Sequence, residues 1–467
     1  MILDPSQRSL LSRRALLARG ACGLGALAAS SLLGHADEPA HGAIPVLHHP
    51  AKAKRVIFLV MSGGPSQLEL FDHKPMLEQH AGKPLPDSII KGQQVAQGKL
   101  NAGAMPCQFP FQLRGKSGQS ISDILPNIAG IADDICIVRS MQTTAINHDP
   151  AQTVMNTGST LSGRPAWGSW TWYGLGNPAQ DLPGFVVLIS AKGGQQQPVS
   201  NRQWHSGFLP SRFQGVHLRH SGDPVSYLRP PEGIDAGRQR ETIDAIAALD
   251  LANPSALNDP SVAERLAQYE MAFRMQTSVP DLAAVDKEPE EIRKLYGLER
   301  DTGGFARCCL IARRLAERGV PFIQVYHRDW DHHGGVKNGV KETAEACDQA
   351  SAALIIDLKR RGLLDDTIVV WGGEFGRTPF AQGDGRDHHM KGYSMWLAGG
   401  GIRGGTSYGA TDDFGYHAVT DVVSIHDLHA TILHQMGVDH RRLTVRHQGR
   451  DHRLTDVHGQ IVRGILA

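Results

Sequence analysis

The sequence predicts an α/β fold, an αβα sandwich with a mainly parallel central sheet. Short apolar runs rich in β-branched residues alternate with longer stretches in which apolar residues recur at helical spacing. Strands that helices bury on both faces have such continuous apolar runs, and an alternation of strands and helices favours parallel pairing. We therefore expect residues 56–60, 322–326 and 368–371 to be central strands of one sheet.

Turn signals at the ends of these runs place the individual elements along the chain. Glycine or an acidic residue bounds most of the apolar runs, and glycine follows several of the amphipathic stretches. The expected strands are residues 55–61, 135–140, 184–188, 320–326, 368–371 and 393–398. The expected helices are residues 123–131, 148–157, 235–276, 305–318, 344–361 and 427–436. Residues 82–117, rich in Gly, Pro and Gln, are expected to be a surface excursion.

The first 36 residues predict an export signal that is separate from the fold. Arg13 and Arg14 precede a weakly apolar stretch at residues 20–34, which ends in small residues and is too short to remain as an anchor. Adjacent arginines are typical of twin-arginine signals, so we expect a periplasmic or secreted protein with no stable membrane anchor after signal removal. A disordered basic tail is the alternative. Residues 50–467 are then expected to form a single α/β domain with surface insertions.

Composition narrows the kinds of partner. The 467 residues carry 48 basic and 47 acidic side chains, so no strong attraction to nucleic acid or to an anionic membrane follows. The chain also has 23 histidines, many of them beside acidic residues. Such clustering favours a metal site over histidines scattered on a surface.

Carboxylates and imidazoles follow the predicted strands, at the points where these strands end. Asp331 and His333 come after the strand at 322–326, and Glu374 comes after the strand at 368–371. Asp387 and His388 lie about fourteen residues after Glu374. Functional groups of parallel sheets collect beyond the carboxyl ends of the strands. We therefore expect Asp331, His333, Glu374, Asp387 and His388 to be metal ligands at one edge of the sheet.

Two further residues are expected to face this edge. Ser62 lies in a glycine-rich turn after the first strand, a turn that could hold an anion or a metal or could be an ordinary tight turn. His148 lies at the start of a helix, where its alternative role is capping or structural. Asp329, His332 and His389 are the neighbours that could replace a chosen ligand, because the sequence does not decide which of two adjacent side chains points inward.

Four motifs make the chain resemble a known family. They are Met-Ser-Gly-Gly-Pro-Ser at residues 61–66, Trp-Asp-His-His at 330–333, Gly-Glu-Phe-Gly-Arg-Thr-Pro at 373–379 and Gly-Arg-Asp-His at 385–388. The chain resembles the DUF1501 proteins from about residue 50 to its end. These are exported bacterial proteins of undefined activity, abundant in planctomycetes and related to the sulfatase and alkaline-phosphatase superfamily. The resemblance implies an alkaline-phosphatase-like fold.

The same resemblance identifies counterparts of superfamily site residues. Asp329 or Asp331 with His333 matches an Asp/His ligand pair, and His388 matches a later histidine ligand. Residues 148–158 are similar to the sulfatase signature Cys-x-Pro-Ser-Arg followed by Leu-x-Thr-Gly. There the cysteine becomes the formylglycine nucleophile, but this chain has His148 at that position, Gln152 in place of the arginine, and Ser62 where a metal-binding Asp is usual.

These features together predict an exported metal-dependent hydrolase of sulfate or phosphate esters that lacks the formylglycine nucleophile. The expected cofactor is a divalent ion (Zn, Mn, Mg or Ca), and the expected substrate is an anionic ester or sulfated glycan. His148 and Ser62 are catalytic candidates. Arg377 and Arg386 are expected to hold ester oxygens, with structural salt bridges as the alternative. The competing function is a non-catalytic protein that keeps the fold and binds anionic glycans.

Overall fold

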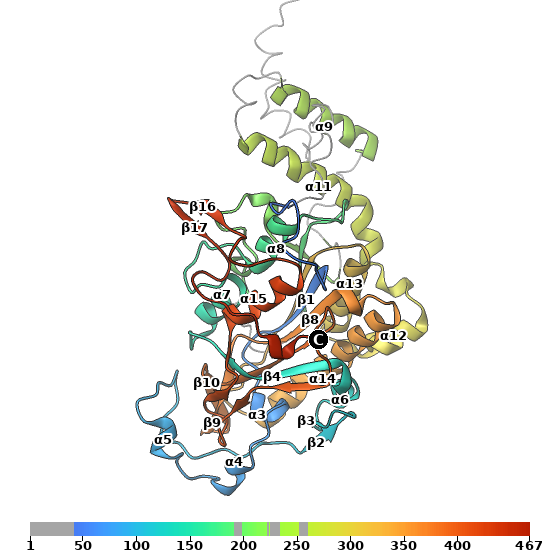
Figure 1. The fold of residues 1–467 in the computed structure, drawn as a ribbon. Coiled ribbons are helices and arrows are strands. Elements are labelled where there is room, and N and C mark those ends of the chain that lie inside the picture. Colours follow the sequence, from blue (N-terminus) through green and yellow to red (C-terminus); the bar gives the residue numbers. More distant parts are fainter. Residues whose placement is uncertain (1–41, 191–198, 222–223, 225–233, 252–259) are drawn as a thin grey trace, which may run out of the picture.

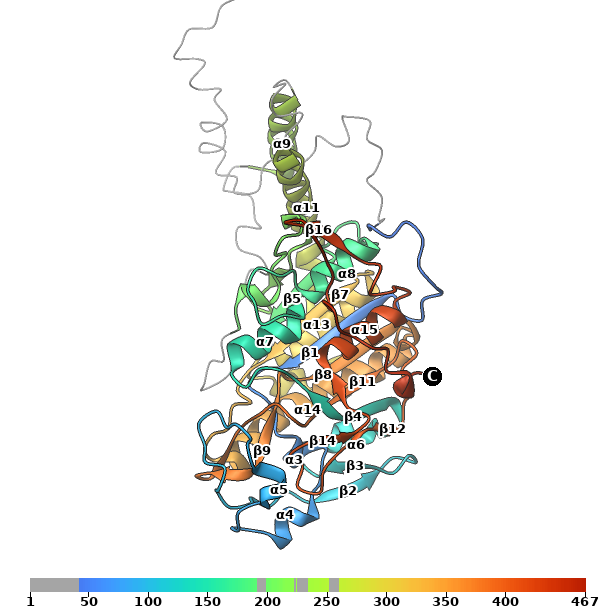
Figure 2. The same ribbon diagram turned by 60° about the vertical axis from the view of Figure 1, so that its left-hand side comes forward.

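The computed structural model describes residues 42–190, 199–221, 224, 234–251 and 260–467. Its central feature is a nine-stranded sheet, drawn through the middle of the body in Figures 1 and 2. The strands run in the order β12 (Thr406–Tyr408), β4 (Ile135–Gln142), β11 (Tyr393–Ala398), β8 (Thr367–Gly372), β1 (Arg55–Met61), β7 (Phe322–His327), β5 (Phe185–Ile189) and β6 (Val216–Leu218), and β15 (Val423–Ser424) also pairs with β4. The twin-arginine signal expected at residues 1–36 lies outside the described residues.

The three strands expected at the centre of the sheet are neighbours there. β1 pairs in parallel with β7 on one side and with β8 on the other. Every residue of β1 is buried, because helices cover both faces. β11 runs antiparallel to both β8 and β4, which makes the sheet mixed but mainly parallel.

The two faces of β1 belong to two separate apolar cores. Ile57 and Leu59 pack with residues of α13 (Phe305–Glu317) and α14 (Val336–Arg360). Val56 and Phe58, which alternate with them, pack with residues of α8 (Trp167–Leu175) and α15 (Ile425–Gln435). Because successive side chains of a strand point to opposite faces, this alternation defines a helical layer on each side of the sheet. The αβα sandwich predicted from the sequence is confirmed.

Most predicted helices are present with modest shifts of their ends. α7 (His148–Thr157) begins after Asn147 and ends at Gly158, whose φ of 68° is left-handed, as the sequence predicted. α6 (Pro126–Gly130) is shorter than expected, and α14 begins eight residues earlier than residue 344. The stretch 235–276 contains two helices, α9 (Ala236–Leu251) and α11 (Pro260–Ala283), which project from the body in both views (Figures 1 and 2).

A hairpin outside the main sheet was not predicted. β9 (Gly376–Gln382) and β10 (Gly385–His389) pair with each other in antiparallel fashion. Pro379 and the flanking glycines argue against a strand in the sequence, but a two-stranded hairpin tolerates them because each strand has one free edge. The hairpin carries Asp387 and His388 and so determines where these side chains lie.

Among the described residues, no helix has the length and apolar character needed to cross a bilayer.

Candidate metal centre

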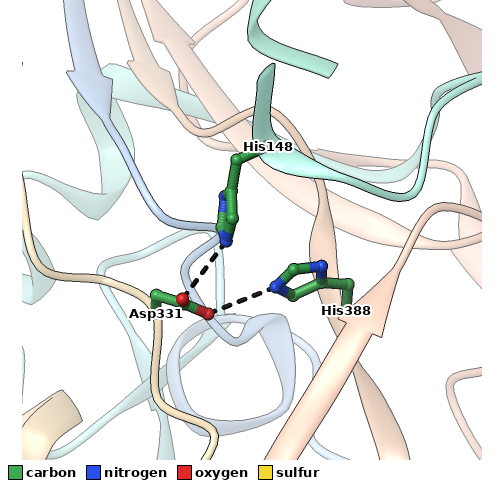
Figure 3. A group of neighbouring side chains, drawn as sticks. All are labelled: His148, Asp331 and His388. Carbon is green, nitrogen blue, oxygen red and sulfur yellow. Dashed lines mark hydrogen bonds and ion pairs between the residues drawn. The ribbon is translucent and has the colours of Figure 1, made fainter. Parts of the chain in front are cut away.

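Three segments that are far apart in the sequence meet beyond the carboxyl ends of β7 and β8. The loop after β7 carries Asp331 and His333, β10 carries His388, and the first turn of α7 carries His148. Figure 3 shows His148 and His388 turned toward the carboxylate of Asp331 from two sides. The described residues contain two groups that could hold a metal ion, His148/Asp331/His388 and His333/Asp387/His388.

The carboxylate of Asp331 is the common neighbour of three imidazoles. Its Oδ2 lies 3.3 Å from Nε2 of His148. Its Oδ1 lies 3.0 Å from Nε2 of His333 and 3.3 Å from Nε2 of His388. The last two ring nitrogens are themselves only 2.9 Å apart. The same atom, Nε2, of each ring is therefore directed into one small volume.

The opposite nitrogen of each ring is bound to an acceptor. Nδ1 of His148 lies 2.7 Å from Oε1 of Glu374. Nδ1 of His388 lies 2.8 Å from the carbonyl oxygen of Ile146, and Nδ1 of His333 lies 2.5 Å from Oε1 of Gln382. An acceptor at Nδ1 places the ring proton there and leaves the lone pair on Nε2, which is how histidines that bind metals are usually oriented.

This arrangement leaves electron pairs facing one another. Nε2 of His148 is buried and has no hydrogen-bond partner within the described part of the chain. Two imidazole lone pairs at 2.9 Å repel each other, as do a lone pair and a carboxylate oxygen, unless a cation lies between them. The donor set thus has the chemistry of a cation site.

The pKa values follow the same electrostatics. Burial alone would raise the pKa of Asp331, but its contacts with His148, His333, His388 and Arg377 hold it far below its usual range. Burial would lower the pKa of His148, but contacts with Asp331 and Glu374 outweigh burial and raise this pKa to about 9. For His388 burial prevails and lowers the pKa. The two carboxylates therefore strongly favour positive charge at the point where the rings converge.

Among the side chains that the structure describes, Glu374 contacts the ring of His148 but neither of the other two rings. It accepts hydrogen bonds from the backbone N–H of Gly63 (3.0 Å), from His148 and from Nε2 of Gln152 (3.2 Å). Burial would raise its pKa, but the interaction with His148 lowers it, so the side chain is a buried anion. A carboxylate behind a histidine fixes the ring and raises its basicity, and the contact of Glu374 with Nδ1 of His148 has this geometry.

Asp387 is close to the rings but is occupied by backbone groups. Its Oδ2 accepts hydrogen bonds from the amides of Gln97 (2.8 Å) and Gly98 (2.7 Å), and its Oδ1 accepts one from the amide of His388 (2.8 Å). Burial would raise its pKa, and these hydrogen bonds lower it. Its Oδ1 lies 3.9 Å from Nδ1 of His333. Through the amides of Gln97 and Gly98, Asp387 holds the segment at residues 82–117 next to the site.

Ser62 lies beneath the site. Its hydroxyl accepts a hydrogen bond from Nε2 of Gln152 at 2.7 Å, and the residue has no exposed surface. Gln152, which stands where the sulfatase signature has arginine, thus connects Ser62 to Glu374. The hydroxyl is close to the cluster but does not face solvent.

The structure corrects the expectation that two arginines hold ester oxygens. Arg377 is 1% exposed and donates to Oδ1 of Asp331 (2.6 Å) and to the carbonyl of Gly64 (2.8 Å), with further bonds to backbone carbonyls. Arg386 is fully buried and pairs with Glu69 at 2.8 Å, away from the rings. The N–H groups of both arginines are directed to acceptors within the protein, as expected for arginines in structural salt bridges.

The near neighbours do not replace the chosen residues. Among the described residues, neither of the two groups that could hold a metal ion includes Asp329, His332 or His389. His389 turns the other way, with Nε2 2.5 Å from the carbonyl of Tyr416. The ring of His332 lies against Gly339 on α14.

Sequence reasoning missed the groups that hold the rings. Gln382 and the carbonyl of Ile146 anchor two histidines, and the amides of Gln97 and Gly98 anchor Asp387. A glutamine or a backbone group has no sequence signal of its own. A β9–β10 hairpin prediction would have found Gln382, because residues 382 and 385 are paired at its end.

Solved structures similar to this chain share little sequence identity with it. The lipoteichoic acid synthase LtaP from Listeria monocytogenes has 9% identity and a TM-score of 0.36, with 84% of this chain and 74% of that chain covered. The PsFucS1 sulfatase from Pseudoalteromonas sp. has 12% identity and a TM-score of 0.35, with 94% and 72% covered. A protein in the alkaline phosphatase superfamily from Vibrio parahaemolyticus has 11% identity and a TM-score of 0.35, with 84% and 68% covered. Because the TM-scores are below 0.5, these similarities do not establish an activity or a cofactor for this chain.

No curated protein matches the chain. A family model described as "Protein of unknown function (DUF1501)" matches residues 53–466. This range includes the whole central sheet and all the side chains that converge on Asp331. The chain therefore belongs to the DUF1501 family.

Proposed function

We propose that this protein is an exported, metal-dependent hydrolase of sulfate or phosphate esters. One observation supports this proposal above all others. Three imidazoles, each fixed through Nδ1, direct Nε2 toward the single carboxylate of Asp331. We assign His148, Asp331, His333 and His388 as the side chains that hold a divalent ion.

The spacing of the ligand atoms around Oδ1 of Asp331 fits one ion. Atoms placed tetrahedrally at about 2.0–2.1 Å from zinc are about 3.3 Å from one another. Oδ1 of Asp331 and Nε2 of His333 and of His388 are 2.9–3.3 Å from one another, and Nε2 of His148 lies 3.3 Å from Oδ2 of Asp331. A set dominated by imidazole suits zinc or manganese better than magnesium or calcium, which prefer oxygen ligands.

The residues behind the ligands have positioning roles in this proposal. Glu374 keeps the proton of His148 on Nδ1, and Arg377 holds the Asp331 carboxylate by a hydrogen bond to Oδ1. Asp387 fixes the backbone next to His388. When bound, a divalent ion would lower the pKa of a water molecule and neutralise charge on an ester oxygen.

Water is the nucleophile in this scheme. Position 148 is a histidine, so no formylglycine forms there, and Ser62 is buried beneath α7. Attack by water at sulfur or phosphorus breaks the bond to the ester oxygen, which leaves as the alcohol. We therefore propose that Ser62 is not the nucleophile. Its hydroxyl instead helps to position Gln152, which donates a hydrogen bond to Glu374.

The proposal also covers the expected domain organisation. Residues 1–36 direct export through the twin-arginine pathway, and residues 50–467 act as one domain. Replacing both Arg13 and Arg14 by Lys would then leave precursor in the cytoplasm. Unchanged export of this variant would contradict the signal assignment.

A second candidate is non-catalytic binding of anionic glycans, and one observation favours it. His148, His333, His388 and one oxygen of Asp331 together provide four donors, which is the number of ligands in a closed structural zinc site. Catalytic zinc sites keep a position open for water or substrate. Metal binding without hydrolysis is the outcome that this candidate predicts.

Metal analysis combined with an activity assay tests the proposal. The purified protein is stripped with a chelator, reloaded separately with Zn, Mn, Mg or Ca, and assayed with p-nitrophenyl sulfate and p-nitrophenyl phosphate. We expect about one ion of zinc or manganese per chain and hydrolysis of one substrate only when metal is present. Asp331→Asn and His388→Ala should lose both metal and activity, whereas Arg360→Gln, on a distant surface of α14, should lose neither. A folded wild-type protein that binds no divalent ion would refute the proposal.

A further inference from the structure

A second polar site lies along α7, close to the metal centre. Residues from α7, from the segment after it and from the 3₁₀ turn at Asn201–Gln203 enclose a pocket of about 180 Å³. The lining residues are Thr153, Thr157, Leu161, Ser162, Gly163, Arg164, Arg202 and His205. They include two arginines and no carboxylate, and one of the two, Arg202, pairs with Asp149 outside the lining.

Several of the lining groups are hydrogen-bond donors. Arg164 has no carboxylate within ion-pair distance among the described residues, and its Nη1 donates to Nδ1 of His452 at 2.8 Å. Nδ1 of His205 accepts a hydrogen bond from the amide of Gly207 at 2.8 Å, which places the ring proton on Nε2. The guanidinium groups, this N–H and the hydroxyl of Ser162 are the donors that an oxyanion binds.

Other lining groups are acceptors. The hydroxyl of Thr153 donates to the carbonyl of Asp149 at 2.6 Å, and that of Thr157 donates to the carbonyl of Thr153 at 2.8 Å. Because each hydroxyl has a single proton, the oxygen of Thr153 presents only lone pairs to the pocket, whereas the oxygen of Thr157 also accepts a hydrogen bond from the amide of Ser159 at 3.3 Å. Donors for an anion and acceptors for O–H groups therefore line the same pocket. A sulfated or phosphorylated sugar carries both kinds of group.

The pocket is connected to the metal centre through α7. Arg202 pairs with Asp149 at 2.8 Å, and Asp149 follows the ligand His148 directly. Thr153 and Thr157 are five and nine residues along the helix from His148, a distance of about 8–14 Å at the α-helical rise of 1.5 Å per residue. The Arg202–Asp149 pair is about half exposed on both sides, so water screens it and a ligand can compete for the guanidinium.

We propose that this pocket is a second subsite that binds an anionic group and neighbouring hydroxyls of an oligosaccharide whose ester lies at the metal centre. This inference rests on the proposed function, and it narrows the substrate to a glycan with at least two anionic groups. The pocket is smaller than the roughly 300–1,000 Å³ of sites that enclose a drug-sized ligand, so it suits one substituted sugar unit.

Calorimetric titration of the zinc-loaded full-length protein tests the subsite. The probes are sulfated dextran oligosaccharides, the same oligosaccharides without sulfate, and polyphosphate, which has anionic groups but no sugar hydroxyls. The variants are Arg164→Gln and Arg202→Gln. Arg360→Gln is the matched control, because its side chain is 54% exposed against 51% for Arg202 and is also in an ion pair.

We expect sulfated dextran to bind more tightly than both other probes. Arg164→Gln and Arg202→Gln should each weaken its affinity about tenfold, as expected for loss of one charge-assisted interaction. The control should bind within twofold of the wild type, and the metal content of all variants should be unchanged. Affinity for sulfated dextran that both pocket variants leave within twofold of wild type would overturn the subsite. Polyphosphate binding as tight as that of sulfated dextran would overturn its assignment to a sugar.

The subsite and the hydrolase proposal can fail separately. If the protein binds no metal and cleaves no ester, arginine-dependent binding of sulfated dextran still supports the subsite. If metal-dependent hydrolysis is found but the arginine variants bind as the wild type does, only the subsite is lost.

Discussion

Two buried charged clusters lie near the same edge of the protein, and they differ in how their polar groups are satisfied. In the first, Arg386 donates to Glu69 and to the backbone carbonyls of Thr378, Met105 and Pro106. In the second, three imidazole nitrogens face the carboxylate of Asp331 and one another. The first cluster pairs donors with acceptors, whereas the second brings three imidazole nitrogens together around one carboxylate.

This difference separates a structural role from a functional one. Buried charges that are paired and hydrogen-bonded hold a fold together, and removing one partner leaves the other unpaired at high cost. The convergent imidazoles of the second cluster gain most of their energy from a cation, while Arg377 holds their shared carboxylate. The two clusters should therefore respond in opposite ways to mutation and to metal.

The largest expected effect is on the paired cluster. Arg386→Ala should lower the free energy of unfolding by about 3–5 kcal/mol, because Glu69 would stay buried without its partner. Denaturant unfolding of the metal-free protein measures this change. His333→Ala removes one ring of the other cluster but leaves Asp331 paired with Arg377, so it should cost much less under the same conditions. Equal losses for the two variants would remove the distinction between the clusters.

The next effect concerns stabilisation by metal. Zinc at a free concentration of 100 times its dissociation constant should add about 2.7 kcal/mol to the stability of the wild type. Asp331→Asn should show no gain, because it removes the negative charge and one of the two oxygens between the imidazoles. Arg386→Ala, where it folds, should keep the gain. Thermal unfolding with and without zinc measures both, and a full zinc effect in Asp331→Asn would contradict the assignment.

A smaller effect is expected for a residue behind the ligands. Glu374→Gln should weaken zinc affinity about 10–100-fold, as substitution of groups that orient metal ligands typically does. The amide keeps the size of the side chain but removes the charge that favours a proton on Nδ1 of His148. Competition with a zinc-binding dye measures the affinity. An affinity equal to that of the wild type would show that Glu374 does not act through His148.

The smallest effect concerns a buried histidine that belongs to neither cluster. His429 has Nε2 2.8 Å from the carbonyl of Met155, and burial lowers its pKa to about 3. The unfolded chain therefore takes up a proton as the pH falls below about 6.5, whereas the folded chain does not do so until about pH 3. Stability is lost over this window as the pH falls.

The His429→Gln variant tests whether stability is lost as the pH falls. His429→Gln cannot take up a proton, so its loss of stability between pH 7 and pH 5.5 should be about 1 kcal/mol smaller than that of the wild type. Denaturant unfolding at the two pH values measures the difference. Parallel pH profiles would show that His429 is protonated equally in the folded and unfolded states.

Much of the sheet could be predicted from the sequence. Residues 56–60, 322–326 and 368–371 are apolar runs between turn signals, and burial on both faces requires little more than that pattern. The position of Asp331 and His333 follows from the end of β7 by the same reasoning. The hairpin of β9 and β10 could not be predicted in this way, because its strands contain Pro379, arginines and histidines instead of an apolar alternation.

The roles of individual side chains depended on their direction. Asp331 and Glu374 both follow a strand, yet one carboxylate meets three rings and the other meets the back of one ring. Arg377 and Arg386 are next to ligand motifs in the sequence, but their guanidinium groups are buried among protein acceptors. The orientation of these side chains is set by tertiary packing, which the sequence pattern alone does not reveal.

Anomalous diffraction at the zinc absorption edge, from crystals soaked in zinc, tests the central claim most directly. We expect one strong peak bounded by Nε2 of His148, His333 and His388 and by the carboxylate of Asp331, at about 2.0–2.2 Å from each ligand atom. The same crystals of Asp331→Asn should lack the peak. No peak at this position in the wild-type protein, or a peak beside other residues, would contradict the assignment of these four side chains as a metal centre.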